Sequence, residues 1–483
     1  MHCNSLPCNI FSFNKLRLVL CNFSLDEDVF PADFSFGVAT AAYQIEGGWN
    51  ADGKGPSIWD TFTHNHPEMI ADRSNGDVGP DSYNLFEEDL AALKELGVNH
   101  YRFSIAWSRV LPSGDKSSLN THGIAYYNTV INKLLENNIK PMVTMYHYDL
   151  PEELQKIGGL ANPLFIKYYR EYADVLYSNF GDRVKVWITF NEPADFCIPG
   201  YGLAIYPPQA NASGIGEYLC MHHVIKGHAL AYRLYKEKYA EQRGKVGMTI
   251  SSRFLYSKNF NVSIQLGWST HAIFSKTGGY PQIMEKVIEE NSKNEGRTWS
   301  RLPEFDTHWK NFIKGSSDFL GINYYTSRFV ESTNSPSGRN PSMQRDESLN
   351  YFTDPKWKRA KSSWLYSVPQ GLEDLLRWIK DNYNNVEVIV TENGWSDDGG
   401  LEDDDRIDYL KSHVKAVLNA IKSGCNVKGY TFWSLIDNFE WDRGYTEKFG
   451  LYAINYTSAF KERIPRKSVQ VYKSIIENRR VNL

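Results

Sequence analysis

Two glutamates that lie far apart in the chain occupy equivalent places, because each directly follows an apolar, β-like run. Glu192 lies in VKVWITFNEP (Val184–Pro193), and Glu392 lies in VEVIVTENG (Val386–Gly394). Near-continuous Val, Ile, Trp and Phe is typical of strands buried on both faces of a parallel sheet. The carboxyl ends of such strands meet at one face of a barrel, so the two glutamates are candidates for a paired-carboxylate site. Hydrolysis of a glycosidic bond requires such a pair of carboxyls. One acts as general acid and base, and the other acts as nucleophile or activates water.

Either glutamate alone has a simpler interpretation. A Glu at the end of a strand commonly forms a structural salt bridge or caps a helix, and structural ion pairs also shift carboxyl pKa values. The remaining elements of the chain therefore decide whether the two glutamates form one site.

Short β-like runs alternate with longer amphipathic segments eight times along the chain. The predicted strands are Phe34–Ala39, His100–Ile105, Lys140–Tyr146, Lys185–Phe190, Val246–Ile250, Phe319–Asn323, Val386–Thr391 and Val427–Trp433. The predicted helices include Asp81–Leu96, Tyr126–Asn137, Pro163–Asn179, Glu217–Glu241, Gly371–Asn382 and Asp404–Ser423, in which apolar residues recur at three- and four-residue spacing. This alternation is typical of parallel strands in a closed barrel. The expected fold class is α/β, a single (β/α)8 TIM barrel whose long βα loops form a deep pocket.

No linker divides this pattern. We expect one domain over residues 30–483, preceded by residues 1–29 as an N-terminal extension that is processed or disordered. The length of 483 residues fits, since barrels often exceed the usual size of a single domain. The most polar region, residues 331–361, follows the sixth predicted strand, and we interpret it as a long loop over the barrel mouth rather than a domain boundary.

The composition describes a soluble globular protein, with 42% hydrophobic and 23% charged residues. A net charge of -4 gives no basic field to attract nucleic acid or anionic lipid. No stretch approaches the roughly 18 uninterrupted apolar residues that a membrane span requires. We therefore expect neither a nucleic-acid nor a membrane partner. The 13 Trp and 30 Tyr serve core packing by default, and sugar stacking is a minority use that depends on position.

The six cysteines are too few for a disulfide framework and show no metal-binding CxxC spacing. Cys197 and Cys220 are able to pair, but nothing in the sequence requires it. N-glycosylation motifs favour a secreted protein, and they begin at Asn22, Asn211, Asn261 and Asn455. The apolar patch Leu16–Cys21 is interrupted by Arg17 and makes a poor signal sequence, so a cytosolic location remains the alternative.

The chain resembles the glycoside hydrolase family 1 β-glucosidases from about Phe30 to Ile475. The resemblance rests on motifs that occur in the family's order. They are FSFGVATAAYQIEGG (Phe34–Gly48), RFSIAWSRVLP (Arg102–Pro112), MYHYDLP (Met145–Pro151), TFNEP (Thr189–Pro193), INYYTS (Ile322–Ser327), VTENG (Val390–Gly394) and FWSLIDNFEW (Phe432–Trp441). The resemblance implies a retaining enzyme that acts on β-linked sugars, with the acid/base in TFNEP and the nucleophile in VTENG.

In a retaining enzyme the two carboxyls lie only about 5 to 5.5 Å apart, so one attacks the sugar while the other protonates the leaving oxygen. The resemblance implies that Glu392 is the nucleophile and that Arg102 and Tyr325 contact it. A nearby guanidinium favours the ionised form that a nucleophile needs. Glu192 then lies beside that negative charge, and repulsion raises its pKa so that it holds a proton near neutral pH.

The resemblance also implies a set of side chains that bind the sugar. Those expected to contact its hydroxyls are Gln44, His147, Asn191, Asn323, Glu440 and Trp441. Trp433 resembles the stacking platform under the sugar ring, and the Trp433–Ser434 peptide is expected to be cis. Trp364 resembles a platform for the leaving group, although an exposed loop tryptophan packs there equally well. Glu440 followed by Trp441 suits free hydroxyls at C4 and C6, so we expect an unphosphorylated sugar.

Other candidate sites are weaker. His64, His66 and Glu68 lie in a polar loop without further ligands, and the helical histidines His222, His223 and His228 form no complete metal set. We expect no metal and no cofactor, which disfavours a metal-dependent barrel hydrolase.

Two alternatives to a β-glucosidase remain open. A non-catalytic sugar-binding relative would lose one carboxylate, whereas both are present here. A β-thioglucosidase is the closer rival, because some family members that cleave S-glucosides replace the acid/base Glu with Gln. The retained Glu192 favours O-glucosides but leaves S-glucosides possible. The expected partner is a small β-glycoside, and the expected assembly is a monomer or homodimer.

Overall fold

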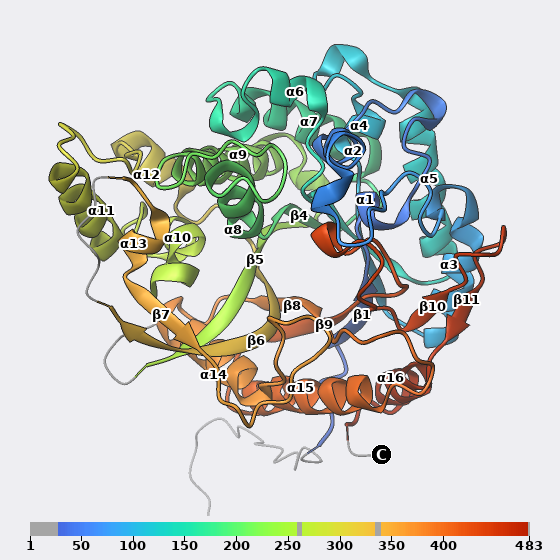
Figure 1. Ribbon diagram of the computed structural model, residues 1–483. Coiled ribbons are helices and arrows are strands. Elements are labelled where there is room, and N and C mark those ends of the chain that lie inside the picture. The colour runs from blue at the N-terminus through green and yellow to red at the C-terminus, as the bar shows by residue number, and fades with distance from the viewer. Residues whose placement is uncertain (1–27, 258–262, 334–339, 482–483) are drawn as a thin grey trace, which may run out of the picture.

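Eight parallel strands close into a barrel in the computed structural model, which describes residues 28–257, 263–333 and 340–481 (Figure 1). The strands are β1 (Ser35–Ala39), β2 (His100–Ser104), β3 (Lys140–Tyr146), β4 (Val186–Asn191), β5 (Lys245–Tyr256), β6 (Leu320–Ser332), β8 (Val388–Asn393) and β9 (Val427–Trp433). Each strand pairs in parallel with its neighbour, and the pairings of β1 with β9 and of β5 with β6 complete the ring. The expected (β/α)8 TIM barrel is confirmed.

Helices surround the barrel in Figure 1. The long ones are α3 (Ser82–Leu96), α5 (Thr121–Glu136), α7 (Phe165–Phe180), α9 (Gly216–Lys238), α10 (Ser263–Phe274), α11 (Gln282–Asn294), α14 (Pro369–Asn382), α15 (Asp404–Lys422) and α16 (Lys467–Asn478). The short ones are α1 (Ala42–Ile45), α2 (Ile58–Asn65), α4 (Trp107–Val110), α6 (Glu152–Lys156), α8 (Pro193–Phe196), α12 (Thr307–Ile313) and α13 (Met343–Glu347). A small antiparallel pair, β10 (Tyr452–Ile454) and β11 (Arg463–Pro465), lies outside the barrel.

Helix α7 shows how the outer layer fixes the strand ends. Its buried face carries Tyr169 and Tyr172, which turn toward the barrel with helical spacing. The Tyr169 hydroxyl donates to the carbonyl of Thr189 in β4 at 2.5 Å, and the Tyr172 hydroxyl donates to the carbonyl of Met145 in β3 at 2.9 Å. These bonds hold the carboxyl ends of the adjacent strands β3 and β4. Glu192, the first candidate glutamate, directly follows β4.

The predicted strands coincide with the observed ones at β3 and β9, and the others differ at their ends. The largest differences are at β5 and β6, which continue past the barrel and pair with each other as far as Tyr256 and Phe329. Strand β7 (Leu349–Phe352) then adds to β6 in an antiparallel pairing. Residues 331–361 were expected to form a loop, and this is wrong in part, because β7 and α13 lie within them.

The predicted N-terminal extension, residues 1–29, lies outside the described residues except for its last two. Within the three described ranges, no helix is both long enough and apolar enough to cross a membrane. Cys197 and Cys220, whose pairing the sequence left open, form a disulfide with a Cα–Cα distance of 5.6 Å.

Candidate active site

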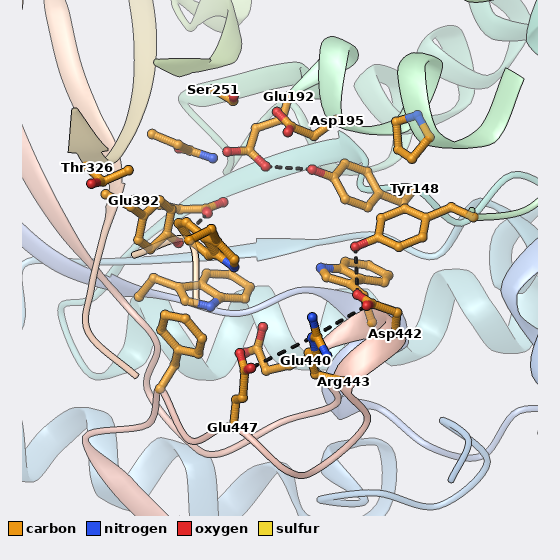
Figure 2. Close-up of a pocket in the computed structure, with 18 of the residues that line it drawn as sticks. Tyr148, Glu192, Asp195, Ser251, Thr326, Glu392, Glu440, Asp442, Arg443 and Glu447 are labelled. Carbon is orange, nitrogen blue, oxygen red and sulfur yellow. Dashed lines mark hydrogen bonds and ion pairs between the residues drawn. The ribbon is translucent and has the colours of Figure 1, made fainter. Parts of the chain in front are cut away.

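A pocket of about 420 Å³ opens at the carboxyl ends of the barrel strands (Figure 2). Most of the predicted site residues line it, namely Glu192, Glu392, Tyr325, His147, Asn323, Trp364, Trp433, Glu440 and Trp441. Arg102, Gln44 and Asn191 do not line the pocket, and they lie buried behind its wall. The structure therefore brings the two glutamates of β4 and β8 to one cavity.

Glu192 follows β4 directly and precedes the short helix α8. Its backbone adopts the left-handed conformation, with φ of 46°, and its amide donates to the carbonyl of Thr249 in β5. The carboxyl accepts a hydrogen bond from the hydroxyl of Tyr148 at 2.5 Å. Within the described residues, no cation forms an ion pair with Glu192.

Glu392 is the penultimate residue of β8, and its environment differs. Arg102 in β2 donates to Glu392 Oε1 at 2.5 Å, in an ion pair whose two side chains are almost fully buried. Tyr325 in β6 donates to Oε2 at 2.8 Å. The contacts that the family resemblance implied for Arg102 and Tyr325 are both present.

The two carboxyls differ in their preferred protonation. Burial raises the pKa of Glu192 well above its ordinary value, and the neighbouring charges of Glu392 and Asp195 raise it further. Burial also raises the pKa of Glu392, but the guanidinium of Arg102 and the hydroxyl of Tyr325 oppose that rise. Because, of the two carboxyls, only Glu392 forms an ion pair with a cation among the described residues, Glu392 ionises first and Glu192 keeps its proton.

Asn191 lies behind the pocket wall and contacts Arg102, Asn323 and His147. Its Oδ1 accepts from Arg102 at 2.7 Å and from the amide of Asn323 at 3.0 Å, while its Nδ2 lies 3.1 Å from His147 Nε2. These contacts fix the guanidinium of Arg102 relative to β4, which carries Asn191, and β6, which carries Asn323. Burial lowers the pKa of His147 well below its ordinary value, so the ring is neutral.

The aromatic side chains form one wall of the pocket. His147 stacks with Trp433 at a centroid distance of 5.9 Å and with Trp441 at 6.0 Å. The Trp433–Ser434 peptide is cis, as the resemblance implied. Trp364 packs edge to face against Tyr325 at 5.6 Å and is 38% exposed, which places it at the outer part of the pocket.

Gln44, behind the pocket wall, contacts the segment that carries the lining residue Glu440. Gln44 Nε2 donates to the carbonyl of Phe439 at 2.7 Å, directly beside Glu440. Burial raises the pKa of Glu440 well above its ordinary value, and the adjacent carboxylate of Glu447 adds to the rise. Gln44 Oε1, Glu440 Oε1 and His147 Nδ1 are buried atoms without a hydrogen-bond partner among the described residues.

Several lining residues were missed by the reasoning from sequence, namely Tyr148, Asp195, Arg253 and Glu447. Tyr148 stands next to His147 in the motif MYHYDLP, which was the available signal, but nothing in a sequence shows which way a loop side chain turns. The other three belong to none of the quoted motifs. Arg253, at the far end of β5, forms no ion pair within the described residues.

The histidine candidates have ordinary partners. His64 pairs with Asp77 at 2.8 Å, and His66 lies 3.3 Å from Glu68. His222 faces the hydroxyl of Tyr280. In the part of the chain that the structure describes, no group of three or more His, Cys, Asp or Glu side chains is arranged to hold a metal ion.

The disulfide anchors the segment that follows Glu192 to helix α9. Replacing Cys197 and Cys220 together by Ser is expected to lower the free energy of unfolding by about 2 to 4 kcal/mol, because the bond closes a loop in the unfolded chain. Its cysteines are 23 positions apart. Thermal unfolding with and without dithiothreitol measures the effect, and Cys425→Ser, a buried free thiol, is the control. An unchanged midpoint in the double variant would contradict a formed bond.

Comparison with known proteins agrees with this geometry. The model of "Glycosyl hydrolase family 1" matches residues 26–481. Myrosinase 1 of Brevicoryne brassicae is 45% identical over 461 residues, covering 92% of this chain and 98% of that protein. Cytosolic beta-glucosidase of Homo sapiens is 40% identical over 464 residues, covering 93% and 98%.

A solved structure shows the same fold with a sugar attached. It is a mutant of the rice Os3BGlu6 β-glucosidase in a covalent complex with Glc, which is 36% identical with a TM-score of 0.87 and covers 92% of this chain and 98% of that one. A family match across nearly the whole chain, together with relatives at this level of identity, establishes membership. The chain belongs to glycosyl hydrolase family 1 and is a glycoside hydrolase of the TIM-barrel type.

Proposed function

We propose that this protein is a retaining β-glycosidase that hydrolyses O-linked β-D-glucosides by double displacement. The observation that carries the proposal is the unequal environment of two buried carboxyls in one pocket. Glu392 is paired with Arg102, whereas Glu192 faces other carboxyls and has no cation partner among the described residues. One carboxyl is thereby suited to attack as an anion and the other to deliver a proton.

In the first step, an oxygen of Glu392 attacks the anomeric carbon of the sugar. The bond from that carbon to the leaving oxygen breaks, and the proton of Glu192 moves to the leaving oxygen. Tyr325 and Arg102 hold the attacking carboxylate from two sides, at 2.8 Å and 2.5 Å. The product of this step is a glycosyl ester on Glu392 together with the released aglycone.

In the second step, water attacks the anomeric carbon and the ester bond to Glu392 breaks. Glu192, now ionised, takes a proton from the water and returns to its starting state. The negative charge of Glu392 is absent while the ester exists, so the repulsion that raised the pKa of Glu192 is relieved at that stage. The covalent complex with Glc of the rice relative supports such an intermediate for this chain.

Buried polar atoms in and behind the pocket wall suit a ligand rich in hydroxyls. Three buried polar atoms, on Gln44, His147 and Glu440, have no partner within the described residues, and a buried polar atom left unpaired costs about 1 to 3 kcal/mol. Hydroxyl groups of a sugar form hydrogen bonds with such atoms. The carboxyls of Glu440 and Glu447 lie close enough to repel each other, so a phosphate at C6 would be disfavoured there.

Replacing Glu440 by Ser is expected to change the choice of sugar. The lost carboxylate leaves the C4 and C6 hydroxyls of glucose poorly satisfied, whereas a β-fucoside has no C6 hydroxyl to lose. The ratio of kcat/KM for glucoside over fucoside should fall about tenfold or more, since 1.36 kcal/mol corresponds to one decade. Initial rates on the two aryl glycosides measure the ratio.

The control is Glu402→Ser, which removes an exposed carboxylate that pairs with Lys467. Its ratio should equal that of the parent protein. If the ratio were also unchanged in folded Glu440→Ser protein, Glu440 would not determine the specificity for the sugar.

A second candidate function is hydrolysis of S-linked β-glucosides. It is favoured by the 45% identity with the protein named Myrosinase 1. The retained Glu192 favours O-glucosides, because a thiol leaving group needs little protonation. The two functions share the pocket and the nucleophile, and they differ in the leaving group that each accepts.

One panel of substrates tests the proposed function. It contains an aryl β-glucoside, the matching β-galactoside and β-fucoside, cellobiose and a glucosinolate, each with and without a chelator. The expected result is hydrolysis of the aryl β-glucoside that a chelator does not change. Hydrolysis of the glucosinolate alone would favour the thioglucosidase, and no hydrolysis by folded protein would favour a non-catalytic sugar-binding relative.

A further inference from the structure

Tyr148 makes the closest contact to the candidate acid/base. It lies in the loop that follows β3, and its hydroxyl donates to Glu192 Oε2 at 2.5 Å (Figure 2). The side chain is buried, and aromatic neighbours hold its ring. These are Trp441 at a centroid distance of 4.7 Å, His147 at 5.2 Å and Phe196 at 5.6 Å. The ring therefore has little freedom to turn its hydroxyl elsewhere.

Both ends of this hydrogen bond rest on an uncommon backbone conformation. Tyr148 has φ of 75° and Glu192 has φ of 46°, in the left-handed region that bulky residues rarely adopt. Such conformations persist only where the surrounding structure imposes them, and they gather at functional sites. Two loops from adjacent strands, β3 and β4, are thus each bent so that one side chain meets the other.

Among the described residues, Tyr148 donates the shortest side-chain hydrogen bond to Glu192. The amide of Asn191 lies 3.4 Å from the same oxygen. The other charged and titratable groups that line the pocket are His147 after β3, Asp195 on α8, Tyr206 in the loop before α9, Arg253 on β5, Tyr325 on β6, Glu392 on β8, and Glu440, Asp442, Arg443 and Glu447 after β9. Arg102 on β2 lies behind the pocket wall. Arg102 and Tyr325 are directed to Glu392, and both neighbouring carboxyls repel an ionised Glu192.

We propose that Tyr148 is a positioning residue, whose hydroxyl orients the carboxyl of Glu192 and stabilises its ionised form so that one group serves as acid and then as base. The inference rests on the proposed glycosidase function and deepens it. It goes beyond the pairing of Glu192 and Glu392, because it assigns the donor that balances repulsion at Glu192.

The hydrogen bond acts in both steps of the reaction. When Glu192 is protonated, donation to Oε2 leaves the proton on Oε1, so a single oxygen is directed toward the leaving group. When Glu192 is ionised, the same donation stabilises the carboxylate and lowers its pKa, against burial and the charges of Glu392 and Asp195. Burial raises the pKa of Tyr148 itself well above its ordinary value, so the hydroxyl remains a donor at every working pH.

The variant Tyr148→Phe tests this inference because it removes the hydroxyl and keeps the packed ring. The basic limb of the profile of kcat/KM against pH should move upward by about one pH unit, since a hydrogen bond to a charged group shifts its pKa by at least that much. For an activated dinitrophenyl β-glucoside, whose second step limits turnover, kcat should fall about tenfold. Azide, which needs no general base, should restore the rate.

A second variant protects the test against a folding defect. Tyr148→3-fluorotyrosine adds one small atom and makes the hydroxyl a stronger donor, so the basic limb should move downward, opposite to its direction in Tyr148→Phe. The matched control is Tyr445→Phe, which removes the hydroxyl of a partly buried tyrosine that donates to the carbonyl of Asn75 outside the pocket. Its pH profile should equal that of the parent protein.

If the parent protein hydrolyses glucosides, either of two results would overturn the inference about Tyr148. One is a basic limb that moves in neither Tyr148 variant. The other is a higher KM in Tyr148→Phe with an unchanged profile and no effect of azide, which would mean that Tyr148 contacts the sugar rather than Glu192. A parent protein that hydrolyses no glycoside would instead overturn the proposed function, so the two failures are distinguishable.

Discussion

Replacing Glu392 by Ala is expected to abolish turnover of every substrate. No covalent intermediate forms without the nucleophile, and Arg102 is left as a buried cation without its carboxylate partner. The loss should reach the detection limit with aryl β-glucosides. Added azide or formate should partly restore activity, because a small anion fits where the carboxylate was, and the product should have inverted configuration at the anomeric carbon. Colorimetric rates and proton NMR of the product measure the two effects.

The control for Glu392→Ala is Glu387→Ala at the opposite end of the same strand. Glu387 precedes β8 and pairs with Lys245 near the surface, so its loss should leave activity unchanged. Full residual activity in folded Glu392→Ala protein would remove Glu392 from the role of nucleophile.

Replacing Glu192 by Ala or Gln is expected to slow substrates with poor leaving groups by about 10² to 10⁴, the usual contribution of general acid and base catalysis. Activated aryl glucosides should be affected less in the first step, because their leaving groups need little protonation. Azide should accelerate these variants and give a product of retained configuration. Steady-state kinetics over a series of leaving groups measures the effect.

The pH profile provides the matching test for Glu192. Because the acid form is required and its pKa is raised well above the ordinary range, kcat/KM of the parent protein should fall as the pH rises through that pKa. This basic limb should be absent in Glu192→Gln. Equal slowing of good and poor leaving groups, with no azide effect, would show that Glu192 is not the acid/base.

The barrel could be predicted from the sequence because its strands are buried on both faces. Val427–Trp433 and Lys140–Tyr146 are β-like runs that are buried except at one lysine each, and they match β9 and β3. The extensions of β5 and β6 could not be predicted in the same way. Their outer parts are held by pairing with each other and with β7, which depends on the meeting of distant segments rather than on any local pattern.

The candidate site was likewise predictable only in part. The position of Glu192 and Glu392 at strand ends was visible in the sequence, since parallel strands deliver their ends to one face. Which side chains would surround each carboxyl was not visible. Tyr148 contacts Glu192 from a loop in which its own backbone is left-handed, and Glu447 lines the pocket from a segment without a motif. Such contacts arise from tertiary packing, which no single run of residues encodes.

Trapping of the glycosyl-enzyme tests whether Glu392 is the nucleophile of a double displacement. A dinitrophenyl 2-deoxy-2-fluoro-β-glucoside forms the covalent intermediate and slows its hydrolysis, so the labelled protein accumulates and is digested for mass spectrometry. Double displacement through Glu392 requires one fluoroglucosyl group per chain, attached to the side chain of Glu392. A label on another residue, or no label from a protein that hydrolyses the parent glucoside, would contradict a double displacement through Glu392.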